Sequence, residues 1–388
     1  MITKQLADSI GPRPSALVFI CCSAVLAAAA CSTEAPTGAW GTPVVTAVGN
    51  PADLSPPIGA YARHVDRAEF GRHRYTKIAA GHSSVCGIRD DGQLLCAGEV
   101  SKFTDWPIFD TQTERIGGQF VDVAVGGGTV CGLLADRTLR CGGMNDYRQA
   151  EPPNGTYKQI VVTGGHACAL ATDGTLACWG SNQYGGSEVP DGAYIHITAI
   201  GALSCAVAVD SSIACWGIDE YGQTEVPDGT YTQVAPGHRH ACAIATHGAV
   251  ECWGTNEYGQ TDAPSGTYTQ LTSGGEHSCA LRTDGVIACW GSNEYGQTDA
   301  PSGTYTQIVG DQLSNCALDE RGAIACWGYN ESLRLDAPAG VFTQVSPGGL
   351  NCALTADNRA DCWAELRPDF DDPSSSDLLN SAEDWIYR

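Results

Sequence analysis

The stretch CALRTDGVIACWG, residues 279–291, combines two cysteines ten positions apart with a central Asp-Gly and a terminal Trp-Gly. Successive first cysteines of this pattern are 45, then five times 37, and finally 36 residues apart. Repetition at a fixed period is the sequence signature of a protein assembled from similar structural units. The chain therefore contains eight units. The seven further copies begin at Cys86, Cys131, Cys168, Cys205, Cys242, Cys316 and Cys352.

The central Asp-Gly predicts a hairpin. Residues 283–285, Thr-Asp-Gly, fit a three-residue loop that ends on a left-handed glycine. Arg282 then pairs with Val286, and counting back along both strands places Cys279 opposite Cys289. Opposed positions alternate in type, and the cysteines fall on a non-hydrogen-bonded pair, with Cα atoms about 4.5 Å apart. A disulfide spans that distance, at the short end of its usual range.

The amino terminus indicates export. Lys4 and Arg13 precede an uncharged run at 16–30, ALVFICCSAVLAAAA, which is short for a membrane span and typical of a signal-peptide core. Cys31 follows directly, as in bacterial lipoprotein signals, and we expect it to carry lipid. Ordinary secretion with cleavage nearby and a buried apolar helix are the alternatives. The sequence has no second long apolar segment, so no span is expected in the mature chain, which we place at the cell envelope, in the outer membrane or secreted.

Export favours disulfides over the other uses of cysteine. Structural zinc sites use close cysteine pairs with roughly two to four intervening residues, and redox pairs use Cys-x-x-Cys; nine residues intervene here. Of nineteen cysteines, Cys21, Cys22 and Cys31 belong to the signal region, and sixteen remain. The predicted disulfides are Cys86–Cys96, Cys131–Cys141, Cys168–Cys178, Cys205–Cys215, Cys242–Cys252, Cys279–Cys289, Cys316–Cys326 and Cys352–Cys362.

Composition limits the class of partner. The 388 residues are 43% hydrophobic and 17% charged, which is typical of a globular protein. Forty-four acidic against 21 basic residues give a formal net charge of -23. An acidic surface repels phosphate backbones, so nucleic acid is not expected as a partner.

Each unit holds more than the hairpin. An alternating run such as YTQLTSGG from Tyr268 predicts a strand before it, and WGSNEYGQTDAPSG at 290–303 is a connecting loop. A 37-residue unit thus has room for three short strands, which cannot bury both faces alone, so the units must stack. A closed ring and an open β-solenoid both allow stacking. Hairpins within each unit favour the ring.

The pattern Gly-Gly-x-His-x-Cys-Ala-Leu-x-x-Asp-Gly-x-x-x-Cys-Trp-Gly-x-Asn-x-Tyr-Gly-Gln resembles the repeat of the regulator of chromosome condensation family, in its short bacterial branch with hairpin cysteines. That branch resembles the propeller-type β-lactamase inhibitory proteins. The resemblance covers about 75–363 and implies an all-β propeller of seven or eight three-stranded blades. Units one and two lack Trp-Gly, and unit one carries an insertion at 102–115. We therefore expect either that the early blades are irregular or that the first unit completes the last blade.

The resulting division of the chain has four parts. We expect a lipoprotein-type signal peptide at 1–30, a polar linker able to supply a closing strand at 31–70, the propeller at 71–363 and an acidic tail at 364–388.

The sequence offers no catalytic motif, and we expect no metal, cofactor or enzymatic activity. One histidine precedes the first cysteine in four units, at His82, His166, His240 and His277, and we expect these histidines to make structural hydrogen bonds. The Asp-Gly pairs are turn formers in preference to calcium sites. The tryptophans after the second cysteines are expected to pack between blades in preference to stacking on sugars.

The connectors carry the best candidates for a binding surface, because tyrosine combines a large rigid area with a polar tip. Packing between blades is the alternative for these side chains. The leading hypothesis is an exported, non-enzymatic, monomeric scaffold that binds a protein or surface ligand at the bacterial envelope. The alternatives are a propeller enzyme acting on polysaccharide in a central channel and, from the family name alone, a guanine nucleotide exchange factor. The candidate rim residues are Tyr184, Tyr221, Tyr258, Tyr295, Asn182, Asn256 and Asn293.

Overall fold

The computed structural model describes residues 70–81, 84–98, 119–330 and 335–363, all within one unit, Pro57–Arg388. The predicted signal peptide, the linker up to residue 69, Cys31, His82, the insertion and the tail lie outside these ranges. The described residues form eight three-stranded antiparallel sheets, each from three consecutive strands. The strands are β1 (Tyr75–Ala80), β2 (Ser84–Arg89), β3 (Leu94–Gly98), β4 (Phe120–Gly126), β5 (Thr129–Leu134), β6 (Leu139–Gly143), β7 (Tyr157–Val162), β8 (His166–Ala171), β9 (Leu176–Gly180), β10 (Tyr194–Ile200), β11 (Leu203–Ala208), β12 (Ile213–Gly217), β13 (Tyr231–Pro236), β14 (His240–Ala245), β15 (Val250–Gly254), β16 (Tyr268–Ser273), β17 (His277–Arg282), β18 (Ile287–Gly291), β19 (Tyr305–Gly310), β20 (Ser314–Asp319), β21 (Ile324–Gly328), β22 (Phe342–Ser346), β23 (Asn351–Thr355) and β24 (Ala360–Trp363).

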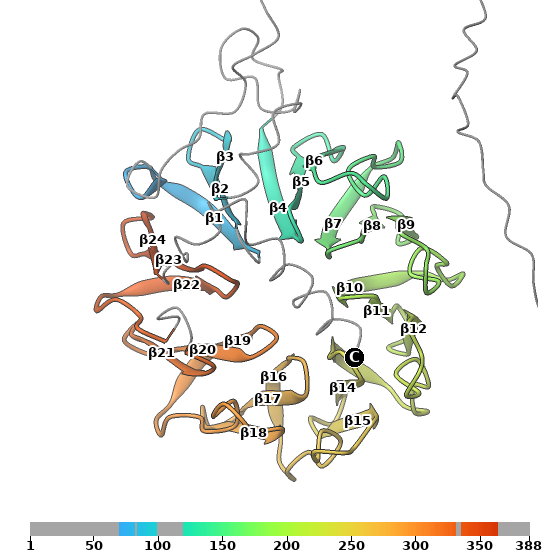
Figure 1. Ribbon diagram of the computed structural model, residues 1–388, viewed down its shortest axis with the longest axis vertical. Helices are drawn as coiled ribbons and strands as arrows, with labels where there is room; N and C mark the ends of the chain where they lie inside the picture. Colours follow the sequence, from blue (N-terminus) through green and yellow to red (C-terminus); the bar gives the residue numbers. More distant parts are fainter. Residues whose placement is uncertain (1–69, 82–83, 99–118, 331–334, 364–388) are drawn as a thin grey trace, which may run out of the picture. The chain divides into compact units, whose positions relative to one another are not determined.

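The eight sheets stand around a ring as the blades of a β-propeller (Figure 1). The ring closes between the last blade and the first, because β22 and β23 contact β1 and Arg74 bridges to Arg359. The Gln344 side chain also donates to the main-chain oxygen of Ile78, at 3.1 Å. The prediction of an all-β propeller is confirmed, with eight blades in the described part of the chain. The first two units form complete sheets, and the first does not complete the last.

The hairpin has the predicted register. Arg282 donates its main-chain N–H to Val286, Gly285 is left-handed with φ of 82°, and Cys279 stands opposite Cys289. All eight cysteine pairs are bonded, one in each blade. The Cα atoms of Cys279 and Cys289 are 4.0 Å apart, closer than the roughly 4.5 Å expected. The disulfide draws together two residues that already form the closer, non-hydrogen-bonded type of pair.

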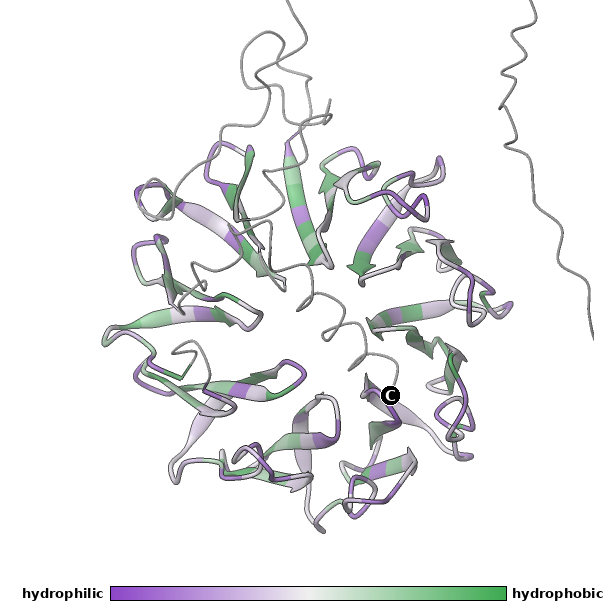
Figure 2. Cartoon of the chain, in the orientation of Figure 1, coloured by the Kyte–Doolittle hydropathy of each residue, from purple (hydrophilic) through white to green (hydrophobic). Residues whose placement is uncertain are grey.

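The hydrophobic core lies in the seams between blades. Apolar residues occupy the strands, while the connecting turns are largely hydrophilic (Figure 2). Each of the eight apolar clusters joins the two blades that flank one seam. In one of them Tyr268 and Trp290 of the sixth blade pack on Cys242 and Ile244 of the fifth. Single blades therefore depend on their neighbours, as three short strands require.

The repeated tryptophans and histidines fix these seams with hydrogen bonds. The indole N–H of Trp290 donates to the main-chain oxygen of Gln260 in the preceding connector, at 2.8 Å. The imidazole Nε2 of His240 lies 2.8 Å from the Ser278 hydroxyl of the next blade. Both predictions, packing for the tryptophans and structural bonding for the histidines, are confirmed for the described residues. His277 bonds the Asn315 side-chain amide of the next blade in place of a serine. Bonds equivalent to those of Trp290 and His240 are made by Trp179, Trp216, Trp253, Trp327 and His166.

Glutamines of the inner strands join neighbouring blades a second time. Gln270 on β16 donates to the main-chain oxygen of Thr306 at 2.8 Å and accepts from the N–H of Ile308 at 3.0 Å. The side-chain amide thereby pairs with β19 as a strand residue would. Gln159 and Gln233 also pair with the next blade, where each bonds both the N–H and the carbonyl oxygen of a single residue, Ile197 and Leu271 respectively. The structure gives no such bond for Gln307, the equivalent residue on β19, to any described residue.

Candidate binding face

Five connectors share one turn, which we call the tyrosine turn. The side-chain oxygen of its first residue accepts a hydrogen bond from the main-chain N–H five positions later. Asn256 accepts in this way from Thr261 at 2.9 Å, and the NH₂ group of Asn256 donates to the Asp262 carboxylate at 3.0 Å. The Gln260 amide oxygen accepts the N–H of Tyr258 at 2.8 Å, and the Gln260 side chain is fully buried. These bonds fix the backbone on both sides of the tyrosine. In the turn 182–188, Gly186 stands at the glutamine position, so the glutamine bond belongs to the other four turns. The five turns are 145–151, 182–188, 219–225, 256–262 and 293–299.

The asparagines proposed for the rim thus hold the turn. Asn182 and Asn293 make the same two bonds as Asn256, to Ser187 and Glu188 and to Thr298 and Asp299. Their amide groups are engaged inside their own turns, so the tyrosine rings are the groups left to contact a ligand.

The tyrosine rings point outward. The exposed fraction is 38% for Tyr221, 56% for Tyr258 and 38% for Tyr295, and Tyr184 is half-buried. The seams are packed mainly by other residues, such as Tyr268 and Trp290, while Tyr221 and Tyr295 also contact Arg239 and Tyr329 of the neighbouring blades. Each turn follows the third strand of a blade, opposite the Asp-Gly hairpin. Equivalent positions of rotated blades share one side of the ring, which we call the tyrosine face.

Sequence reasoning missed a fifth tyrosine. Tyr147 is 55% exposed, lies 37 residues before Tyr184 and has its N–H bonded to Gln149 at 2.9 Å, as in the other turns. The 37-residue spacing could have identified it, although its unit lacks Trp-Gly. Tyr329 was also missed; its ring meets that of Tyr295 edge-on, with centroids 5.0 Å apart.

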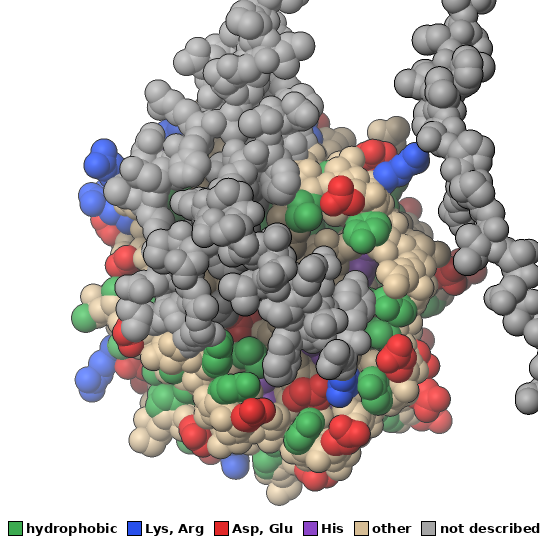
Figure 3. Space-filling view, viewed as in Figure 1, with side chains coloured by type: hydrophobic (Ala, Val, Ile, Leu, Met, Phe, Trp, Pro, Cys, Tyr) green, Lys and Arg blue, Asp and Glu red, His purple; other side chains and the backbone are tan. Residues whose placement is uncertain are grey.

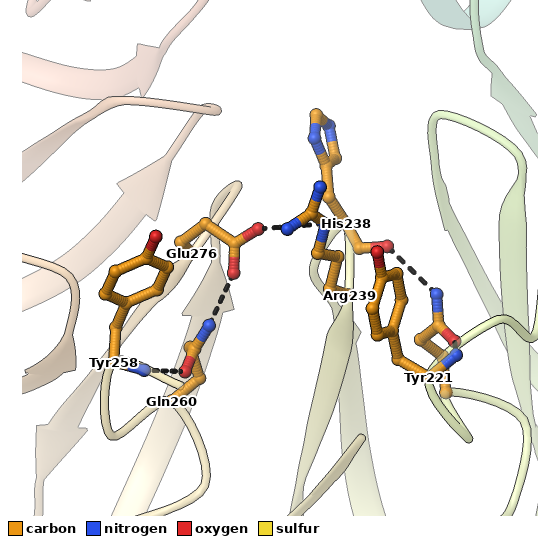
Figure 4. A network of polar contacts seen from close by, with 7 residues as sticks. Tyr221, His238, Arg239, Tyr258, Gln260 and Glu276 are labelled. Carbon is orange, nitrogen blue, oxygen red and sulfur yellow. Dashed lines mark hydrogen bonds and ion pairs between the residues drawn. The ribbon is translucent and has the colours of Figure 1, made fainter. Parts of the chain in front are cut away.

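A polar network joins two neighbouring tyrosine turns (Figure 4). Arg239, on the turn between β13 and β14, places its guanidinium over the Tyr221 ring, 5.0 Å from the centroid. The same guanidinium lies 3.5 Å from the carboxylate of Glu276, on the turn between β16 and β17. Gln260 donates to the other oxygen of that carboxylate. Arg239 occurs in only one unit, so the repeat pattern gave no signal for it.

The electrostatics of this network follow from its partial burial. Burial raises the pKa of the Glu276 carboxyl above its ordinary value, while the Gln260 amide and the Arg239 guanidinium act in the opposite direction. Burial and the neighbouring Arg239 charge lower the pKa of His238. The network therefore presents one cation held between an aromatic ring and a carboxylate.

The tyrosine turns are strongly acidic. They carry ten exposed carboxylates and one basic side chain, Arg148. Asp and Glu are also prominent on the face shown in Figure 3, where Lys and Arg are few. The carboxylates of the turns are Asp146, Glu151, Glu188, Asp219, Glu220, Glu225, Glu257, Asp262, Glu294 and Asp299.

Outside the tyrosine face, the described residues include three buried histidines and one sizeable cavity. The buried imidazoles of His166, His240 and His277 are partnered by hydroxyl and amide groups in separate seams. A cavity of about 680 Å³ lies between β19 and β22 and is lined by Gln307, Asp319 and seven further residues, none of them histidine. No group of three metal-ligating side chains occurs in the described ranges, and no helix there has the length and apolarity needed to cross a bilayer.

Comparisons with known proteins agree with this architecture. The family model for the Regulator of chromosome condensation (RCC1) repeat matches residues 157–185, 231–260 and 268–297. No curated protein matches the chain.

Solved structures resemble the propeller. The ectodomain of the Physcomitrella patens receptor kinase CR4 has a TM-score of 0.52 and 26% identity, over 65% of this chain and 74% of its own. The CRINKLY WD40 ectodomain of the Arabidopsis thaliana receptor kinase ACR4 has a TM-score of 0.50 and 22% identity, over 66% and 96%. Prp20p from Saccharomyces cerevisiae, studied for binding to Gsp1p and histones, has a TM-score of 0.52 and 13% identity, over 82% and 98%.

The last two likenesses establish the fold alone, and the repeat matches establish the kind of unit from which it is built. The chain is thus an eight-bladed propeller that repeats one disulfide-bonded hairpin in each blade, and three of its repeats match the regulator of chromosome condensation repeat.

Proposed function

We propose that the chain is a non-enzymatic scaffold that binds a protein through its tyrosine face. The observation that carries the proposal is the recurrence of exposed tyrosines on turns whose backbones are already fixed by hydrogen bonds. Aromatic anchors on a preorganised backbone lose little conformational entropy on binding. A surface of this kind, spread over five blades, suits a macromolecule better than a small ligand, which needs a concave pocket.

The proposal places this scaffold outside the cytoplasm. Eight disulfides are typical of proteins that fold in an oxidising compartment. The sequence before the propeller adds a signal-peptide pattern that ends at Cys31. The proposal is therefore an exported protein, anchored to the envelope by lipid on Cys31 and monomeric.

Site-specific photocrosslinking in the producing cells tests the binding face. A benzophenone amino acid is placed at Tyr258 and, as the matched control, at Val286, which is 44% exposed at the hairpin end of the following blade. We expect a protein adduct from position 258 and none from position 286. Adducts of equal yield from both positions, or none from any of Tyr147, Tyr221, Tyr258 and Tyr295, would show the assignment to be wrong.

A further inference from the structure

We infer that the partner presents a basic segment, rich in arginine or lysine, to the tyrosine face. This inference rests on the proposed function and adds the chemical class of the partner. It depends on the charge of the tyrosine turns, on the contacts of Arg239 and on the position of Tyr258.

The charge of the turns favours a cationic ligand. Ten exposed carboxylates and one arginine lie on the same five turns that carry the tyrosines. Complementary charge accelerates encounter and selects between partners, and like charge across an interface is costly. An acidic or phosphorylated segment would meet repulsion at every turn, whereas a basic one would meet a carboxylate near each ring.

Arg239 shows how this face accommodates a guanidinium. Its cation lies over the Tyr221 ring at 5.0 Å and within 3.5 Å of the Glu276 carboxylate. A cation over an aromatic face is stabilised by the ring quadrupole, and a nearby carboxylate adds a charge-assisted contact. The chain thus fills one ring-and-carboxylate position with its own arginine.

Neighbouring turns repeat the ring and the carboxylates without that arginine. Tyr258 occupies the position of Tyr221 in the next turn, 37 residues on, and Glu276 stands where the preceding blade has Arg239. Figure 4 shows the Tyr258 ring beside the Glu276 side chain. Tyr258 is 56% exposed, and Glu257 next to it is exposed as well. Because Glu276 already contacts Arg239 and Gln260, an arginine or lysine from a partner can lie over the Tyr258 ring with Glu257 as its carboxylate.

Selection from a random peptide library displayed on phage tests the inference. Peptides are selected on the full protein and counter-selected on a variant carrying Tyr221→Ser, Tyr258→Ser and Tyr295→Ser. We expect the enriched peptides to carry net positive charge with arginine or lysine at recurring positions. Enrichment of neutral or acidic peptides would overturn the basic-segment inference and leave the tyrosine face intact. Failure of the library to distinguish the two proteins would count against the face itself.

A charge-swap pair then separates the tyrosine face from the overall negative charge. One variant carries Glu220→Lys, Glu257→Lys and Glu294→Lys on the tyrosine turns; the other carries Asp191→Lys, Asp228→Lys and Glu320→Lys near the hairpin ends. All six side chains are exposed, and the structure gives none of them a hydrogen bond or ion pair with another described residue. For an enriched basic peptide we expect at least about a tenfold loss of affinity in the first variant and less than about twofold in the second. Equal losses would mean that net charge alone attracts the peptide, and the inference would fail.

Discussion

The indole nitrogen of Trp290 lies 2.8 Å from the main-chain oxygen of Gln260, thirty residues earlier in the chain. This bond links the last strand of one blade to the tyrosine turn that leads into it. Because Trp290 is 6% exposed and packs in the seam with Tyr268 and Cys242, it fixes the turn and the core together. The surface that we propose for binding is therefore held in place by the seam beneath it.

Removing this hydrogen bond should destabilise the protein measurably. Trp290→Phe keeps most of the buried ring and leaves the Gln260 carbonyl without its donor, so we expect a loss of about 1–3 kcal/mol in the free energy of unfolding. Trp290→Ala also opens a cavity, and we expect about 3–5 kcal/mol. Urea titration followed by circular dichroism measures both. A Trp290→Phe variant as stable as the native protein would show that the bond contributes nothing.

The glutamine bonds between blades make a second prediction with a matched control. Gln270→Ala removes the acceptor for the Ile308 N–H and the donor for the Thr306 carbonyl, so we expect faster hydrogen exchange at the Ile308 amide and a loss of about 1–2 kcal/mol. Gln307→Ala changes the equivalent residue of the next blade, for which the structure gives no such bond. We expect its effect to stay within about 0.5 kcal/mol. If the two variants behave alike, side-chain pairing does not explain the seam.

Local register was predictable from the sequence, and contacts between blades were not. Counting back from Gly285 placed Cys279 opposite Cys289, because antiparallel pairing leaves no freedom once the loop is known. The partner of His240, 38 residues away on the next blade, depends on how blades rotate around the ring, and no local pattern encodes that rotation.

The binding face was predictable where it repeats. The 37-residue period identified Tyr221, Tyr258 and Tyr295, and the same period reaches Tyr147, which was missed. Gln260, in a hydrophilic connector, gave no sign that it would be fully buried, because its burial depends on the following blade. Arg239 is found once, and a residue that departs from a repeat is the one that repeat analysis overlooks.

Each disulfide should add its own contribution to the free energy of unfolding, so that the loss of one leaves the protein folded but less stable. By the chain-entropy estimate, a closed loop of about eleven residues stabilises the folded state by roughly 2.7 kcal/mol. We expect the double variant Cys279→Ser and Cys289→Ser to lose about 2–3 kcal/mol in urea titration while remaining folded, because seven other hairpins keep their bonds. Under reducing conditions the native protein and the variant should have the same free energy of unfolding, because both then lack the bond between residues 279 and 289. A difference that persists after full reduction, verified by thiol counting, would mean that the packing of the sulfur atoms matters more than the covalent bond.

The buried histidines predict a loss of stability in mild acid. Burial lowers the pKa of His166 to about 4 and that of His240 to about 3, while the unfolded chain binds the proton near pH 6.5. Protonation then favours the unfolded state, so the contribution of His166 is complete above pH 6.5 and is lost as the pH falls toward about 4.

At pH 4.5 this loss should be on the order of 2 kcal/mol for His166. We expect His166→Gln to weaken the protein at pH 7, because the bonds to Ser204 and Thr163 change, and to reduce the further loss between pH 7 and pH 4.5 by about that amount. Guanidinium titrations at the two pH values measure both terms. If the variant and the native protein lose the same free energy over this interval, folding does not lower the pKa of His166, and at pH 4.5 the seam holds an imidazolium between the two hydroxyl groups.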